Sequence, residues 1–224
     1  MQDKLEIDMQ TLVALYRNFT DAQNAVDALA RSGVDRNVIS LVANNVTGEY
    51  SDHLHDDDDA VKADEGAAFG AASGGIIGAL VGLGALAIPG IGPVIAAGPL
   101  IAALTGGAVG ALAGAPTGGL VAGLIKTHHL DDADAEIYAE GVRRGETLLT
   151  VQVDDASVSQ TRDLLNKYNP TDIHNESSSW RSEGWSKFDE SASPYNDSDV
   201  QTYRSRTSSS TGVGAGAVGV YPKQ

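Results

Sequence analysis

The stretch GAAFGAASGGIIGALVGLGALAIPGIGPVIAAGPLIAALTGGAVGALAGAPTGGLVAGLI occupies residues 66–125 and contains no Asp, Glu, Lys, Arg or His. Glycine recurs at every fourth position near both of its ends, at Gly66, Gly70, Gly74, Gly78 and Gly82 and again at Gly106, Gly110, Gly114 and Gly118. Residues four apart lie on neighbouring turns of one helix face, so each series would form a groove without side chains. A second helix can approach such a groove closely, as in small-xxx-small membrane pairs. The pattern predicts a glycine-zipper helical hairpin over residues 66–126.

A cluster of helix breakers divides this stretch into two passes. Pro89, Gly90, Gly92 and Pro93 predict the hairpin turn, because proline and glycine both end helices. The first pass, residues 67–88, would be about 33 Å long as a helix, close to the roughly 30 Å of a bilayer core. Each interior glycine costs about 1 kcal/mol relative to alanine, so the helices would need close packing to be stable.

Two environments suit such a hairpin. Its apolar residues favour insertion into a membrane, by only about −2 to −5 kcal/mol for the first pass on the insertion scale. Acidic residues flank it on both sides and positive anchors are few. The alternative is therefore a soluble homo-oligomer, such as a ring, shell or filament, that buries the hairpins in a shared apolar core.

Composition excludes several other roles. The 224 residues carry a formal net charge of −15, which argues against a nucleic-acid partner and against electrostatic docking on anionic lipid. There is no cysteine, so disulfides and thiolate chemistry are excluded. The first ten residues are polar and mixed in charge, so we expect no signal peptide. We expect a membrane-associated protein whose soluble domain lies in the bacterial cytoplasm, with a purely cytoplasmic protein as the alternative.

The chain on either side of the hairpin reads as two similar halves. Apolar patterning predicts strands and helices in the order strand, helix, strand in each half: residues 11–16, 20–33 and 38–43, then 147–153, 157–168 and a short edge strand at 171–175, with a further helix at 131–144. The halves align at one constant offset, for example Leu12 with Leu148 and Leu29 with Leu165. Two such units predict an α+β fold of the ferredoxin-like type, a four-stranded antiparallel sheet with two helices on one face.

These elements define five regions. The first and second halves of the ferredoxin-like domain are residues 1–50 and 127–175, separated by an acidic linker at 51–65 and the hairpin at 66–126. Residues 176–224 are rich in Ser, Gly, Asp, Asn and Thr without apolar periodicity, so we expect a disordered, low-complexity tail whose scattered aromatics have no assigned role. A hairpin that is a separate insertion could be excised and leave a soluble folded domain.

No motif for catalysis or cofactor binding stands out. The chain lacks a phosphate-binding G-x-x-x-x-G-K-[ST] loop and a G-x-S-x-G nucleophile, so we expect no enzymatic activity, cofactor or small-molecule substrate. His53 and His55 precede the hairpin and His128 and His129 follow it, each pair close to aspartates. Imidazole and carboxylate are Zn²⁺ ligands. The bland alternative is two solvated acidic loops, so no metal site is assigned.

Three strings carry a resemblance to a known family. They are NVISLVANN at residues 37–45, IPGIGPVIAAGP at 88–99 and YAEGVRRGETLLTVQV at 138–153. On these the chain resembles the bacterial general stress protein family of the 17M type, whose members carry a glycine-zipper insert, over roughly residues 11–173. The resemblance implies a stress-linked protein, often placed at the membrane, with no agreed molecular activity and no catalytic residues. We therefore expect a non-enzymatic protein that associates with a membrane and self-assembles through the hairpin, and a ligand-binding sheet module is a third class that no residue favours.

Overall fold

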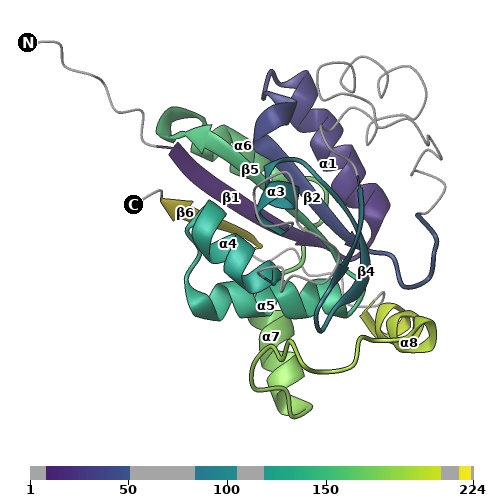
Figure 1. Cartoon of the computed structure of the whole chain (residues 1–224). Coiled ribbons are helices and arrows are strands. Elements are labelled where there is room, and N and C mark those ends of the chain that lie inside the picture. Colours follow the sequence, from purple (N-terminus) through teal and green to yellow (C-terminus); the bar gives the residue numbers. More distant parts are fainter. Residues whose placement is uncertain (1–8, 51–83, 105–118, 208–216, 223–224) are drawn as a thin grey trace, which may run out of the picture.

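A computed structural model describes residues 9–50, 84–104, 119–207 and 217–222, and it confirms a mixed α+β fold (Figure 1). The strands in these ranges are β1 (Met9–Tyr16), β2 (Ile39–Asn44), β3 (Gly84–Ile88), β4 (Gly92–Ala97), β5 (Thr147–Asp154) and β6 (Val218–Pro222). The α-helices are α1 (Phe19–Arg31), α3 (Pro99–Leu104), α4 (Leu120–His128), α5 (Asp132–Arg143), α6 (Val158–Asn166), α7 (Ile173–Ser182) and α8 (Asp197–Thr207). Short 3-10 turns at Arg36–Val38 and Asp155–Ser157 lead into β2 and α6.

The six strands form one antiparallel sheet in the order β3-β4-β2-β5-β1-β6. β5 lies between β1 and β2 and runs antiparallel to both, so β1 and β2 run parallel to each other and are connected through α1. β6 pairs with the free side of β1, from Gln10↔Pro222 to Ala14↔Val218. Elements from both ends of the chain therefore meet at the centre and one edge of the sheet.

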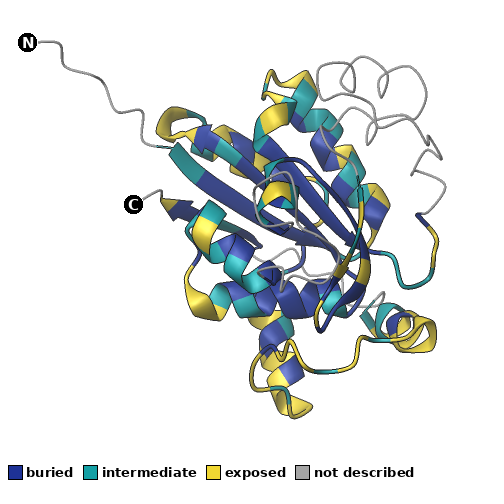
Figure 2. Cartoon of the chain, viewed as in Figure 1, coloured by how far each residue is buried: buried dark blue, intermediate teal, exposed yellow. Residues whose placement is uncertain are grey.

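Helices cover both faces of this sheet (Figure 1). Leu12, Ala14 and Tyr16 of β1 face one side and pack with α1 and α6. Val13 and Leu15 face the other side and pack with α3, α4, α5 and α7. Successive strand residues point to opposite faces, so a strand covered on both sides is apolar along its whole length. Figure 2 shows this burial along the central strands.

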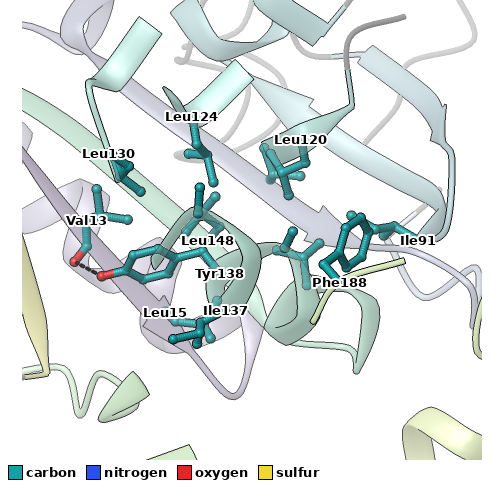
Figure 3. Packing of buried hydrophobic residues seen from close by; sticks show 14 of the residues in the cluster. Val13, Leu15, Ile91, Leu120, Leu124, Leu130, Ile137, Tyr138, Leu148 and Phe188 are labelled. Atoms are coloured by element: carbon teal, nitrogen blue, oxygen red, sulfur yellow. Dashed lines mark hydrogen bonds between the residues drawn. The ribbon is translucent and has the colours of Figure 1, made fainter. Parts of the chain in front are cut away.

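Figure 3 shows at close range the apolar cluster that contains Val13 and Leu15. Leu120, Leu124 and Leu130 come from α4 and the residues after it, and Phe188 comes from the loop after α7. Tyr138 of α5 is fully buried and its hydroxyl donates to the Val13 carbonyl at 3.4 Å. This cluster joins the charge-free stretch and the C-terminal segment to the sheet.

The predicted elements flanking the glycine-rich stretch are confirmed, with small shifts at their ends. α1 begins after Asn18, whose side chain accepts from the Asp21 amide, so the helix starts one residue before the predicted residue 20. α5 begins after Asp131 and ends near Arg143, with acids in its first turn and arginine in its last. That arrangement complements the helix dipole, as expected.

The helical prediction is wrong between residues 84 and 97. β3 and β4 form a β-hairpin there, with Ile88 paired to Gly92 and the turn at Pro89–Ile91. Gly90 and Gly92 have φ of +75° and +96°, a conformation that glycine adopts without strain. Pro89, Gly90, Gly92 and Pro93 therefore lie at a chain reversal, but it joins two strands. β4 pairs with β2, so this part of the charge-free stretch belongs to the sheet.

The nine zipper glycines (Gly66 to Gly82 and Gly106 to Gly118) lie outside the described residues. The second series falls between α3 and α4, which pack on each other. At their contact, a Cβ placed on Gly123 would lie 3.4 Å from Leu100 Cδ1 and 3.5 Å from Leu104 Cδ2. None of the helices within the described ranges is both long and apolar enough to cross a bilayer.

Two predictions for the C-terminal part are wrong. Residues 171–175 are not an edge strand, because Asp172 caps the N-terminus of α7 through the amides of His174 and Asn175. The strand that pairs with β1 is instead β6, at residues 218–222. Residues 176–224 are not a wholly disordered tail either, since α7, α8 and β6 lie there and Trp180 is 1 % exposed.

Candidate functional site

The densest group of buried charged side chains in the described part of the chain lies where α5 ends against α7 and α8. We call it the α5–α7–α8 junction, defined by Arg144, Glu146, Glu176, Trp180 and Tyr203. A groove of about 510 Å³ opens between α7 and α8 and is lined by four of these residues, all except Glu146. The loop 144–146 supplies two members because α5 ends at Arg143, and Gly145, with a φ of +104°, turns the chain into β5.

Arg144 is held by a carboxylate on one side and aromatic rings on the other. Its Nε donates to Glu140 Oε1 at 2.7 Å, and Glu140 is 1 % exposed. The guanidinium carbon lies 4.8 Å from the Trp180 ring centroid, 5.7 Å from that of Tyr203 and 5.8 Å from that of Tyr195. A cation over aromatic faces is attracted by the ring quadrupole, and more strongly away from water. Arg144 therefore binds α7 and α8 to the end of α5.

Glu146 has a different environment, although it is two residues away. Its side chain is 1 % exposed, its Oε1 accepts from Thr171 Oγ1 at 3.2 Å and from the Tyr203 hydroxyl at 3.4 Å, and its Oε2 has no partner among the described residues. Burial and, next, the nearby Glu176 carboxylate raise the pKa of Glu146 to about 8, while Arg17 and the hydroxyls of Thr171 and Tyr203 act in the opposite direction. Glu146 therefore carries a proton at neutral pH.

Glu176 forms an ion pair with Arg17. Its Oε1 accepts from Arg17 Nη2 at 2.6 Å, and its Oε2 accepts from the Tyr203 hydroxyl at 3.4 Å. Arg17 Nη1 also donates to the Thr207 carbonyl at the end of α8. The Tyr203 hydroxyl thus lies between the carboxyl groups of Glu146 and Glu176. Of these two, only Glu176 has an ion-pair partner in the described ranges.

Two glycines make room for this packing. A Cβ on Gly141 would lie 2.3 Å from Leu15 Cδ2 and 2.9 Å from Glu146 Oε2. A Cβ on Gly145 would lie 2.4 Å from Val200 Cγ1, the buried residue of α8. The chemistry of the junction is therefore that of a fitted polar contact, which fastens the C-terminal segment and keeps one ionisable carboxyl out of water.

Of the four histidines considered as metal ligands, the structure describes His128 and His129. His53 and His55 lie outside the described residues. His128 is 1 % exposed and its Nε2 is 3.2 Å from Thr150 Oγ1 on β5, whereas Asp131 caps α5. Within the described ranges, no group of three or more His, Asp or Glu side chains could hold a metal ion.

His128 gives a testable pH dependence. Burial, together with His129, lowers its pKa to about 4 from an ordinary 6.5. The folded protein then binds fewer protons than the unfolded chain between these values, so stability falls as pH falls from 6.5 to 4. We expect a loss on the order of 3 kcal/mol over this window from this group, measured by urea unfolding.

His128→Gln should remove that part of the pH dependence, because glutamine does not titrate. His129→Asn is the matched control, since His129 has a left-handed φ of 58° that asparagine tolerates and its side chain is partly exposed. If His128→Gln and wild type lose stability equally between pH 6.5 and 4, His128 is not the titrating group.

Sequence reasoning missed the junction. Its aromatic members lie in a Ser-rich segment without periodicity, and Glu146 reads as an ordinary turn residue. The available signal was YAEGVRRGETLL, where two glycines and alternating charges precede a buried strand. Comparison with protein-family models, with curated proteins and with solved structures finds no match to this chain.

Proposed function

We propose that this chain is a non-enzymatic, stress-linked protein that self-assembles and associates with a membrane through its charge-free stretch. The observation that carries the proposal is the contact between α3 and α4, which flank the second glycine series and meet at Gly123. Gly123 faces Leu100 and Leu104 of α3, and a Cβ there would make ordinary van der Waals contact with both side chains. A small residue at a helix contact lets two helices approach closely.

The proposed scaffold for this stretch is a ferredoxin-like sandwich with a different fourth strand from the one expected. The strand order β2-β5-β1-β6, with α1 and α6 packed together on one face, supports it. The stretch enters this scaffold after β2 and leaves it before α5. Both of its ends therefore attach to the same domain, which would set the spacing between assembled copies.

A soluble homo-oligomer is the second candidate, and β3 favours it. β3 is an edge strand of the sequence GALAI, with Ala85 and Ala87 exposed and no charged residue. Natural edge strands usually carry charges, prolines or bulges that prevent pairing with another chain. An uncharged edge suits pairing with a second copy in water.

Bulk added to the glycine series tests both candidates. We expect Gly74→Leu with Gly78→Leu to reduce the assembled fraction several-fold, because side chains would hold the helices apart. Light scattering without detergent measures assembly, and flotation with liposomes measures membrane association. Loss of both supports the membrane candidate, whereas loss of assembly in a protein that never floats supports the soluble oligomer.

The matched control places similar bulk beside the series. Ala72→Leu with Ala79→Leu adds apolar carbons without occupying a zipper position, so assembly and flotation should remain as in wild type. If the glycine variant assembles and floats as wild type does, the series does not act through close helix contact and the proposal fails.

A further inference from the structure

The two carboxyl groups of the α5–α7–α8 junction share too few donors for both to be charged. The donors with hydrogen bonds to them are Arg17 Nη2, the Thr171 hydroxyl and the Tyr203 hydroxyl. The Tyr203 hydroxyl has one proton and lies 3.4 Å from an oxygen of each carboxyl, so it can donate to one at a time. Glu176 has the arginine, and Glu146 is left with one neutral donor when Tyr203 turns away.

Charged groups on the neighbouring elements leave this imbalance in place. On α8, Arg204 is paired with Glu49 at 3.2 Å and Arg206 lies 4.0 Å from Glu183. Arg17, at the end of β1, is paired with Glu176 of α7. On α5, Glu140 is paired with Arg143 and Arg144, and Arg144 also lies 3.7 Å from Glu183 at the end of α7. No ion pair to Glu146 exists among the described residues. An ionised carboxylate at 1 % exposure without a cation is costly, so the group keeps its proton.

α8 is the element most easily displaced by a charge at Glu146. Val200 is its one fully buried residue, and the partly buried Tyr203 ring packs on Trp180. Its polar contacts include Tyr203 to the two carboxyls, Arg204 to the Gly145 carbonyl at 3.0 Å and to Glu49 at 3.2 Å, and Arg17 to the Thr207 carbonyl at 2.8 Å. Segments with few buried apolar contacts open at low free energy, independently of global unfolding.

We propose that Glu146 is a pH-sensitive switch for the C-terminal segment: its proton keeps α8 closed on the end of α5, and loss of that proton to solvent as pH rises through the neutral range populates a form with α8 detached. Detachment gives the carboxylate water as a donor and removes the Tyr203 hydroxyl from both carboxyl groups. It also uncovers the groove side of Trp180 and Arg144, which α8 closes through Tyr203. A rise in pH through neutrality would thereby expose an aromatic and cationic surface.

Linkage sets the direction and slope of the effect. The closed form binds the proton with a pKa of about 8, whereas an open, solvated glutamate has its ordinary value of 4.5. The closed form therefore binds more protons between these values, and the open population rises as pH rises. The expected rise is about tenfold per pH unit up to about pH 8, with a plateau above it.

Trypsin cleavage of the full chain after Arg204 and Arg206 reports this opening, because both bonds lie within α8. Each rate, measured by mass spectrometry from pH 6 to 9, is divided by the rate for a free peptide of residues 197–207, which removes the pH dependence of trypsin. Cleavage follows the open population when reclosing is fast. We expect the ratio to rise about tenfold per unit to about pH 8 in wild type. A constant ratio overturns the proposal.

Glu146→Gln should give a ratio that does not change with pH, since the amide is neutral throughout. Glu183→Gln is the matched control, because Glu183 is a half-exposed carboxylate at the same groove, and it should keep the wild-type slope. A slope retained in Glu146→Gln overturns the proposal.

If Glu146→Gln shows no cooperative thermal melt, the titration of wild type decides instead. Carbon-13 NMR of the glutamate carboxyls should show one resonance titrating near pH 8. A spectrum in which every glutamate titrates below about pH 6 overturns the proposal.

Discussion

Trp180→Ala should destabilise the protein by about 3–5 kcal/mol, the cost of removing a large side chain from a packed core. Trp180 is 1 % exposed and is the largest fully buried side chain among the described residues. It contacts the Trp185 ring edge-on at 5.8 Å, and Arg144 lies over its face. Removing it would create a cavity and leave the Arg144 guanidinium with less aromatic surface. Urea unfolding followed by far-UV circular dichroism measures the change.

Trp185→Ala is the control for this measurement. Trp185 is partly exposed and packs only at the margin of the same cluster, so we expect a smaller loss, near 1 kcal/mol. Equal and small losses for both variants would mean that the segment after residue 173 does not belong to the folded core.

Excision of residues 66–125 behind a short linker should abolish cooperative unfolding, contrary to what a separate insertion would do. The excision removes β3, β4, α3 and most of α4, and with them the pairing of β4 to β2. It also removes eight buried apolar residues of one core cluster: Ile88, Ile91, Val94, Ala96, Leu100, Leu104, Leu120 and Leu124. At roughly 1.5–3 kcal/mol for each large side chain, the loss is about 10–21 kcal/mol, as large as the total stability of about 5–15 kcal/mol of a typical domain.

A shorter excision separates the sheet contribution from the rest of the stretch. Replacing residues 67–82 by a linker leaves β3 and everything after it in the chain, so the thermal melt should remain cooperative. Calorimetry of the two variants provides the comparison. A cooperative melt after excision of residues 66–125 would show that β3, β4, α3 and α4 are dispensable for the fold.

Local sequence patterns predicted the strands and helices that are defined by regular apolar spacing and by helix caps. The strands at 11–16 and 147–153 and the helices at 131–144 and 157–168 are confirmed, because apolar spacing and helix caps depend on residues close in sequence. The β3–β4 hairpin was missed since alanine and leucine favour a helix in isolation and the glycines on either side of it recur at a helical period. Gly98 shows the tertiary reason: a Cβ there would lie 2.0 Å from the Ile39 carbonyl, so glycine lets this stretch pack against β2.

The α5–α7–α8 junction depends on contacts that no local pattern records. Trp180 and Tyr203 meet Arg144 from a segment whose composition is that of a disordered chain. Aromatic residues in a polar segment are a weak signal for packing. Their role is evident only once Arg144 is seen to lie over their rings. Glu146 is similar, because its proton affinity is set by burial beneath α7 and α8.

The sheet order has a consequence for folding during synthesis. β1, at residues 9–16, pairs on one side with β5, at 147–154, and on the other with β6, at 218–222. Translation delivers these partners long after β1 has left the ribosome, and pairings so distant in sequence form slowly. The apolar strand β1 therefore remains unpaired until β5 and β6 have been synthesised. Nascent chains with such unpaired apolar strands depend on chaperones to avoid aggregation.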